Sequence, residues 1–271
     1  MRHNKKNCKK TLTGQMISAA LIILCFSFLA VWINRLSTTA AVPVAATEQK
    51  VLLQEEESAL EMEVTRLVED KVLEVPYLSQ KGILPTGCEV TSAAMVLQYW
   101  GVDIAPEELA DKLPCDYLFW EDGKLYGPDP NRFFVGSPFD PNSYGCFAPV
   151  IASIIPKADT AMTAQVLTNV SLEDLYNEYV SQGVPVLVWC TIQMLETSDG
   201  TRWTLPSGEE FVWPRNEHCM VLSGREENEY ICMDPYGSIG QRAIDRELLE
   251  KRYEELGQQA VVILPEEKVI K

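Results

Sequence analysis

The chain has 271 residues, a formal net charge of -16 at pH 7 and 46% hydrophobic residues. This length allows one domain of about 200 residues with appendages, and so acidic a chain disfavours nucleic acid as a partner. Eight cysteines without a CxxC pair and only two histidines leave little for a zinc site, so neither metal nor cofactor is expected. Cys115 and Cys146 would be the pair if one disulfide forms.

An uncharged apolar run of 18 residues, Met16 to Ile33, follows five basic side chains. The run is just long enough to cross a bilayer as a helix, and its basic flank is expected to stay in the cytoplasm. The sequence therefore predicts a basic cytoplasmic tail over 1–15 and one transmembrane or signal-anchor helix over 16–33, with the rest of the chain outside the cytoplasm at the cell membrane. If the segment is cleaved, the protein is secreted.

Residues 34–71 are predicted to connect this segment to a globular domain. Ser37 to Thr47 is rich in small residues and has no periodicity, as in a tether. Glu48 to Lys71 is acidic with an uneven apolar stripe, which is typical of a solvated stalk helix. The domain itself is predicted over 72–265, followed by a tail over 266–271.

The first half of the predicted domain is mainly helical. Val72 to Gln80 has strand composition, and apolar residues at helical spacing then predict an amphipathic helix that begins at Cys88 and ends before Gly101. Three further helices are expected, at Pro106 to Leu113, Ala148 to Ile155 and Leu172 to Gln182. Pro114 to Gly145 is rich in turn-forming and aromatic residues and is expected to be a long ordered surface excursion.

The second half is mainly sheet. β-branched and aromatic runs predict strands at Gly183 to Ile192, His218 to Gly224, Glu229 to Pro235 and Gln259 to Leu264. One more helix is expected at Asp245 to Leu256. Helices first and antiparallel strands second is an α+β order.

Cys88 stands where a nucleophile is expected. The turn Pro85 to Gly87 delivers it to the first position of the predicted helix. Free N–H groups and the positive end of the helix dipole favour a thiolate there. A cysteine taken alone is more often a small buried residue, so the interpretation depends on its partners.

Three further residues supply those partners. His218 is the one histidine after the predicted membrane segment, 130 residues beyond Cys88. The predicted hairpin brings Asp234 beside His218, where it can accept from the ring nitrogen that faces away from sulfur. Gln80 is placed to join the Cys88 backbone N–H in an oxyanion hole. Each residue has an ordinary structural explanation by itself; together they predict a Cys-His-Asp triad.

Seven sequence runs carry a resemblance to a known family: VPYLSQ, PTGCEVTSAAMVLQYWG, GPDPNRFFVGSPFD, YGCFAPVI, GVPVLVW, EHCMVLSG and MDPYG. They resemble bacterial proteins of cysteine peptidase family thirty-nine, the bacteriocin-processing type, in its stand-alone branch without a transporter. The resemblance spans about Val72 to Leu264 and implies a papain-like fold. It also implies the site roles: Cys88 as nucleophile, His218 as general base and acid, Asp234 as orienting residue and Gln80 as oxyanion donor.

The sequence therefore predicts a cysteine peptidase that acts outside the cytoplasmic membrane on a peptide or protein substrate through a thioester. The same site could serve a transpeptidase or a cell-wall amidase. From another class, a non-catalytic extracellular module could bind a peptide or a surface partner with the aromatic excursion. A self-processing factor would cleave its own stalk.

Family members that process double-glycine leaders do so beside a transporter, so leader processing is not carried over. Oligomeric state is not predicted.

Overall fold

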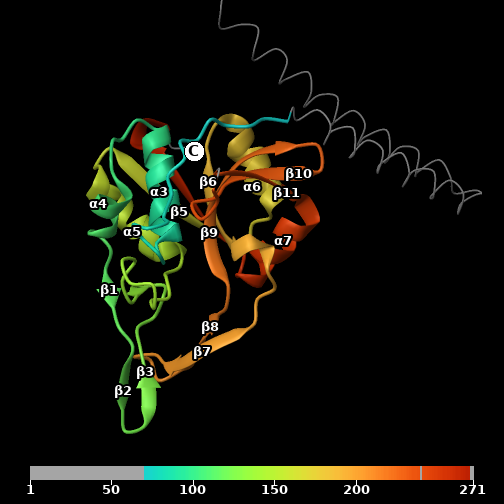
Figure 1. Cartoon of the computed structure of the whole chain (residues 1–271). Coiled ribbons are helices and arrows are strands. Elements are labelled where there is room, and N and C mark those ends of the chain that lie inside the picture. Colours follow the sequence, from blue (N-terminus) through green and yellow to red (C-terminus); the bar gives the residue numbers. More distant parts are fainter. Residues whose placement is uncertain (1–69, 239, 269–271) are drawn as a thin grey trace, which may run out of the picture. The chain divides into compact units, whose positions relative to one another are not determined.

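The computed structural model describes residues 70–238 and 240–268 (Figure 1). The predicted cytoplasmic tail, the membrane segment, nearly all of the linker and stalk, and residues 269–271 lie outside the described residues. Within the described part of the chain, no helix combines the length and the apolar character needed to cross a membrane.

A six-stranded sheet forms the centre of the fold, in the order β11-β10-β9-β6-β12-β5. All its pairings are antiparallel. Its strands are β5 (Met162–Thr168), β6 (Val186–Thr191), β9 (Glu217–Glu226), β10 (Glu229–Met233), β11 (Gln241–Asp245) and β12 (Gln259–Pro265). All six residues of β6 are buried, which explains why its sequence is an unbroken apolar run rather than an alternating one.

Helices cover both faces of this sheet (Figure 1). They are α3 (Cys88–Tyr99), α4 (Pro106–Ala110), α5 (Ala148–Ala158), α6 (Leu172–Glu178) and α7 (Arg246–Glu255), with short 3-10 turns η1 (Val180–Gln182), η2 (Ile192–Met194) and η3 (Glu266–Lys268). α3 packs on β9, α5 packs on β5 and β12, and α7 packs on β6. α6 is capped by Ser171, whose hydroxyl accepts the Asp174 N–H at 3.1 Å.

α3 differs from the amphipathic helix that the sequence predicts. Every residue from Cys88 to Leu97 is buried, including the polar side chains of Glu89, Thr91 and Ser92. The helix is therefore an interior element, and polar groups on it need partners inside the protein.

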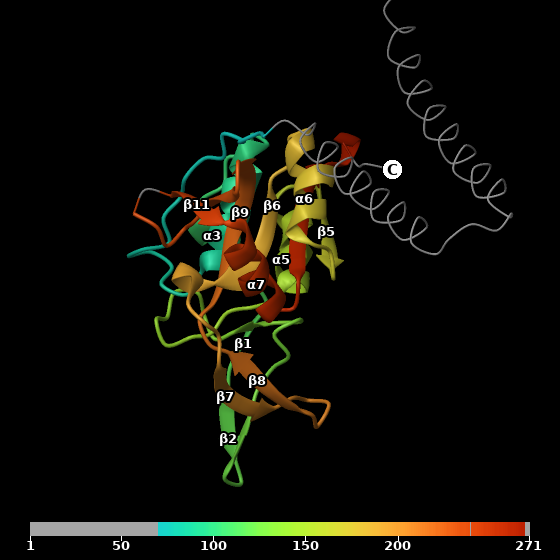
Figure 2. The same ribbon diagram turned by 90° about the vertical axis from the view of Figure 1, so that its right-hand side faces the viewer.

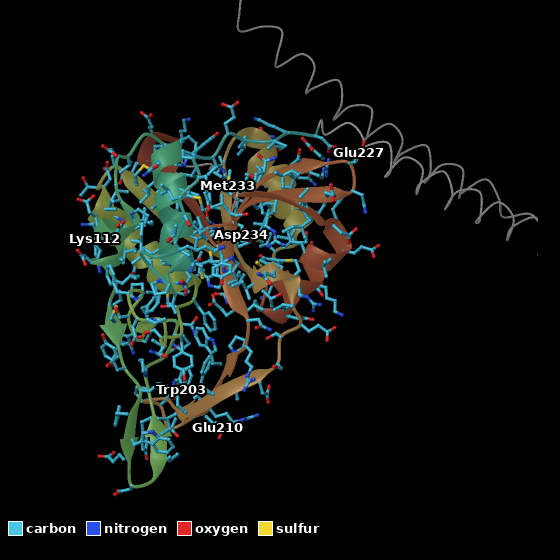
Figure 3. The ribbon with its side chains drawn as sticks, viewed as in Figure 1. Lys112, Trp203, Glu210, Glu227, Met233 and Asp234 are labelled. Carbon is cyan, nitrogen blue, oxygen red and sulfur yellow. The ribbon has the colours of Figure 1, made fainter. Side chains whose placement is uncertain are left out.

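A second sheet projects from the body in both views (Figures 1 and 2), and we call it the arm. Its strand order is β2-β3-β7-β8. The strands are β2 (Phe119–Glu121), β3 (Lys124–Tyr126), β7 (Asp199–Thr204) and β8 (Glu210–Pro214). Trp203 and Trp213 are buried in it together with Val135, and Figure 3 shows Trp203 on the arm and Asp234 in the body. A short parallel pair, β1 (Cys115–Asp116) and β4 (Phe134–Val135), lies outside both sheets.

Two sequence predictions need correction. Val72 to Gln80 is not a strand: it makes a single bridge, between Val72 and Gly224. The reason is that β6 already occupies this edge of β9 up to Leu222, so only the last part of β9 remains open to it. The excursion from Pro114 to Gly145 is ordered, as expected, but it also contains four short strands that the sequence did not predict, and one of them, β3, pairs with β7 from a distant part of the chain.

Candidate active site

A tight turn places Cys88 at the start of α3. The Gly87 N–H donates to the Leu84 carbonyl at 3.0 Å. A Cβ at position 87 would lie 2.8 Å from Leu84 Cβ, so only glycine fits this turn. The Thr91 hydroxyl and N–H both donate back to the Gly87 carbonyl, at 2.7 and 3.0 Å. The position of Cys88 is therefore set by backbone geometry.

The Cys88 thiol lies in a buried, acidic environment. Its Sγ donates to Glu89 Oε2 at 3.3 Å. Burial raises the pKa of the thiol well above its usual value, and the carboxylates of Glu89 and Glu217 raise it further. The prediction that the helix terminus favours a thiolate is wrong for this arrangement, because burial and two nearby acids outweigh the helix dipole.

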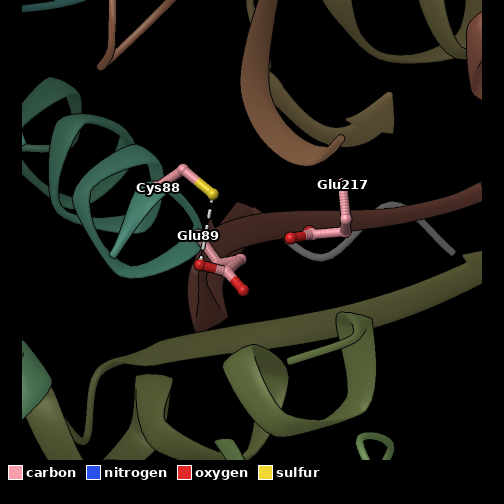
Figure 4. Close-up of side chains that lie close together, drawn as sticks. All are labelled: Cys88, Glu89 and Glu217. Atoms are coloured by element: carbon pink, nitrogen blue, oxygen red, sulfur yellow. Dashed lines mark hydrogen bonds between the residues drawn. The ribbon is translucent and has the colours of Figure 1, made fainter. Parts of the chain in front are cut away.

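Glu89 and Glu217 come together beside the thiol (Figure 4). Glu89 is fully buried, and its Oε1 accepts the Cys146 N–H at 2.6 Å. Burial raises the pKa of Glu89 to about 7. Burial and then the charge of Glu89 raise the pKa of Glu217 well above its usual range. Both residues escaped the sequence prediction, although each is next in sequence to a predicted site residue.

The one candidate cation site in the described part of the chain consists of Cys88, Glu89 and Glu217. One ligand atom from each lies within 4.8 Å of the others. Both Glu89 oxygens, however, already accept hydrogen bonds, from the Cys146 N–H and from the thiol. A cation here would therefore compete with the Cys146 N–H and with the thiol proton for the Glu89 oxygens.

His218 and Asp234 form the hydrogen-bonded pair that the sequence predicts. His218 Nε2 lies 2.8 Å from Asp234 Oδ1, and both side chains are buried. Asp234 also accepts the Tyr236 N–H at 2.8 Å and Arg242 Nη1 at 2.9 Å. Burial by itself would raise the pKa of Asp234, but His218, Arg242 and the Tyr236 N–H together hold this pKa below its usual value. The carboxylate is therefore ionised and fixes the orientation of the ring, which leaves Nδ1 for another partner.

Packing of α3 on β9 brings the cysteine and histidine segments together. Ser92, one helical turn after Cys88, donates from Oγ to the carbonyl of Cys219 at 3.1 Å, and Cys219 follows His218 directly. In this structure the thiol hydrogen bond goes to Glu89, so a contact between Cys88 Sγ and the His218 ring stays a prediction.

Gln80 links the two halves of the site. Its N–H donates to the Pro235 carbonyl at 3.0 Å, beside Asp234. Its side-chain Nε2 lies 3.2 Å from the carbonyl of Pro85, in the turn that leads to Cys88. The amide thus supports the turn, and its predicted role as oxyanion donor stays a prediction. Gln80 Oε1 is buried without a hydrogen-bond partner among the described residues.

The proposed nucleophile and base are buried, and the cysteines of the described residues are unbridged. Cys88 is 5% exposed and His218 1%. All six cysteines in the described residues are free, so Cys115 and Cys146 do not form a disulfide. Of these six, Cys115 is exposed and the other five are buried.

Known proteins are similar to this chain in sequence and in fold. The model of the Peptidase_C39 like family matches residues 72–261. The uncharacterized protein YvpB of Bacillus subtilis strain 168 is 33% identical over 181 residues, which are 66% of this chain and 70% of that protein. The crystal structure of a C39-like protein from Bacillus anthracis has a TM-score of 0.64 at 30% identity and covers 72% of this chain and 98% of that one. The predicted α+β fold is thus confirmed as the mixed helix and sheet fold of these proteins.

A more distant likeness is to a double glycine motif protease from an AMS/PCAT transporter, solved in complex with its leader peptide. The identity is 16% and the TM-score 0.44, over 72% of this chain and 94% of that one.

Proposed function

The chain belongs to the Peptidase_C39 like family, as its sequence motifs predict, and on that premise we propose that it is a cysteine peptidase with Cys88, His218 and Asp234 as its triad. The observation that supports this most is the buried His218–Asp234 hydrogen bond of 2.8 Å. His218 is on β9, and β9 packs against α3, the helix that bears Cys88. An imidazole held in this way by an ionised carboxylate is suited to move a proton to and from a nucleophile.

The proposed reaction has two halves, formation of a thioester and its hydrolysis. His218 Nδ1 takes the thiol proton, and Cys88 Sγ attacks the carbonyl carbon of a peptide or related amide. His218 then passes the proton to the leaving amine, which leaves a thioester. Water, deprotonated by the same ring, attacks the thioester and returns the thiol and a free acid. Asp234 stabilises the imidazolium in both halves.

The Cys88 N–H and the Gln80 amide are the proposed oxyanion donors. The Gln80 amide has to leave the carbonyl of Pro85 to serve in this role. The location of Gln80 supports the proposal, since Gln80 contacts both the turn before Cys88 and the loop after β10. One such donor contributes roughly 3 kcal/mol to transition-state stabilisation in comparable sites.

We further propose that this activity operates outside the cytoplasm, with the chain attached through residues 16–33 or released after their cleavage. The support is the apolar run with its basic flank in the sequence. Protease protection of intact cells and of lysed cells would locate the domain. Degradation only after lysis would contradict an external location.

The test of the peptidase is a cleavage profile of the full chain on a peptide library, with Cys88→Ala and His218→Ala beside it. Both variants should lose cleavage, and a thiol-directed probe should modify Cys88 in the wild type. Because Cys115 is exposed, the labelling is done in a Cys115→Ser background. Labelling of Cys146 with none at Cys88 would refute the assignment of the nucleophile. Added amines that become joined to the product would indicate a transpeptidase.

The arm supports a second candidate, a non-catalytic binding module. Its exposed aromatic side chains include Trp120 at 72% and Phe119 at 55%, and large exposed apolar groups mark interaction sites. Peptide binding that survives Cys88→Ala but is lost with Trp120→Ser, in a chain that cleaves nothing in the library, would favour this candidate.

A further inference from the structure

Two acidic residues flank the proposed nucleophile and base in sequence: Glu89 follows Cys88, and Glu217 precedes His218. Glu89 lies in the first turn of the fully buried part of α3. Glu217 begins β9; part of the residue is exposed, but its Oε1 is buried and has no hydrogen-bond partner among the described residues. Packing of α3 on β9 therefore brings two carboxyl groups to the same place.

Gly145 shows how close these two groups are. A Cβ added there would lie 2.5 Å from Glu89 Oε1 and 3.1 Å from Glu217 Oε2. Both carboxyl groups thus converge on the space that a side chain at position 145 would fill. Figure 4 shows the Glu217 carboxyl group extending toward Glu89 and Cys88. Glycine at position 145 leaves the space in which the two carboxyl groups approach each other.

No positive charge compensates this pair in the described part of the chain, where neither carboxyl group forms an ion pair. The titratable groups that face it are the thiols of Cys88 on α3, Cys146 before α5, Cys190 on β6 and Cys219 on β9. All are neutral or negative. Two adjacent carboxyl groups without a cation disfavour double ionisation in a buried site, so the pair holds a proton more tightly than a separate glutamate would.

We propose that Glu89 is a further catalytic residue: it shares one proton with Glu217 and, through its hydrogen bond to Cys88 Sγ, holds the resting nucleophile as a thiol turned toward the acidic pair. The proposal rests on Cys88 being the nucleophile. On activation the thiol leaves Glu89 Oε2 and its proton passes from Sγ to His218 Nδ1. The acidic pair keeps its shared proton, so the proton count of the site does not change.

The charge of Glu89 then controls the reactivity of Cys88. While Glu89 carries the shared proton, its carboxyl group is neutral and does not repel a thiolate at Cys88. Once Glu89 loses its proton, its carboxylate opposes the thiolate. The rate at which Cys88 reacts with an alkylating agent should therefore rise in two steps with pH, with a bend near the pKa of Glu89, about 7.

The test is the pH dependence of iodoacetamide alkylation of the full chain in a Cys115→Ser background, with the Cys88 peptide quantified by mass spectrometry. Glu89→Gln keeps the size of the side chain and an oxygen for the Cys146 N–H, but removes the charge. This variant should react about tenfold faster than the wild type at pH 8, the effect of one pKa unit, and its profile should show a single step. A profile with the wild-type bend and rate would overturn the proposal.

Two further variants separate this role from simple support of the fold. Glu217→Gln acts from another element and should move the bend to lower pH, because the amide can donate to Glu89 and cannot hold the shared proton. Glu247→Gln is the matched control, an exposed glutamate in the first turn of α7, and should leave the profile unchanged. If Glu89→Gln does not fold, as judged by thermal unfolding, Glu217→Gln decides: an unmoved bend overturns the proposal.

Peptide cleavage, measured in parallel, distinguishes this inference from the peptidase proposal. A wild type that cleaves peptides, with Glu89→Gln leaving the alkylation profile unchanged, overturns the acidic pair alone. A wild type that cleaves nothing, with the bend abolished in Glu89→Gln, overturns the peptidase and supports the acidic control of the thiol.

Discussion

Asp234 and Glu89 are both buried at the proposed site, but their surroundings shift their pKa values in opposite directions. Asp234 has Arg242 at 2.9 Å, the ring of His218 and the Tyr236 N–H, so it stays ionised although it is buried. Glu89 forms no ion pair among the described residues and has a second acid, Glu217, beside it, and burial raises its pKa to about 7 although the Cys146 N–H donates to it. Burial alone therefore does not decide the charge of an acid; the presence of a nearby cation does.

Removing the charge of Asp234 should have the largest effect. Asp234→Asn keeps the shape of the side chain, but its amide can donate to His218 Nε2 and stabilise the tautomer that carries the proton on Nδ1. That nitrogen then cannot accept the thiol proton, and kcat should fall on the order of 10⁴-fold. Steady-state peptide cleavage measures this, with Asp199→Asn on the exposed arm as control. A loss of less than tenfold would contradict the triad.

The pH dependence of stability should come next. The folded-state pKa of Glu89 is about 7, above its usual 4.5, so the native state holds this proton more tightly than the unfolded chain does. Its contribution is fully present below pH 4.5 and is lost as pH rises through 7, on the order of 3 kcal/mol in all. Urea unfolding at pH 5 and pH 8 should show the decrease in the wild type and a smaller one in Glu89→Gln. Equal decreases in the two proteins would count against a raised pKa.

Loss of the cation beside Asp234 should have a smaller effect. Arg242→Met removes a charge that holds the pKa of Asp234 down, so this pKa rises and the carboxylate is lost at higher pH as the solution is acidified. The acid limb of the cleavage profile should move to higher pH, with about a tenfold lower rate at the acid end. Arg202→Met, which breaks an exposed ion pair on the arm, is the control. An unmoved acid limb would show that His218 and the Tyr236 N–H suffice.

A change at the exterior of the arm should matter least. Trp120 is 72% exposed, so Trp120→Ser should change the free energy of unfolding by no more than about 0.5 kcal/mol. Cys88 alkylation should also be unchanged, because β2 lies on the outer edge of the arm sheet and the acidic pair of Glu89 and Glu217 lies on α3 and β9. Urea unfolding and the alkylation profile measure the two quantities. A shift of the alkylation bend would mean that the arm is coupled to Glu217 through β8 and β9.

The elements that the sequence predicted well are those with strong local signals. β6 was expected from its continuous apolar run, and α3 from helical spacing between a Pro-Thr-Gly turn and Gly101, whose φ of +87 suits the position after a helix. β5, β7, β8 and β11 were missed. β5 is an edge strand with mixed polar residues and only two of the six residues of β7 are buried, so neither has the continuous apolar pattern that marked β6.

The candidate site divides in the same way. His218 and Asp234 could be paired from the hairpin that joins their strands, because antiparallel register is a local property. Glu89 gave no such signal. A glutamate in a helix is ordinarily expected on the solvated face, and only the burial of α3 on all sides shows that it is not.

The sequence by itself determined the family and the order of the main elements, and it predicted four site residues, because these depend on motifs and on local periodicity. Only the tertiary structure decided that Glu89 and Glu217 meet beside Cys88, that Gln80 supports the turn before it, and that β3 of the excursion pairs with β7 in the arm. The first and the last of these contacts join residues that are far apart in the chain, and the meeting of Glu89 with Glu217 depends on how α3 packs against the sheet. The state of the thiol depends on them, since charge in a buried site is set by neighbours in space.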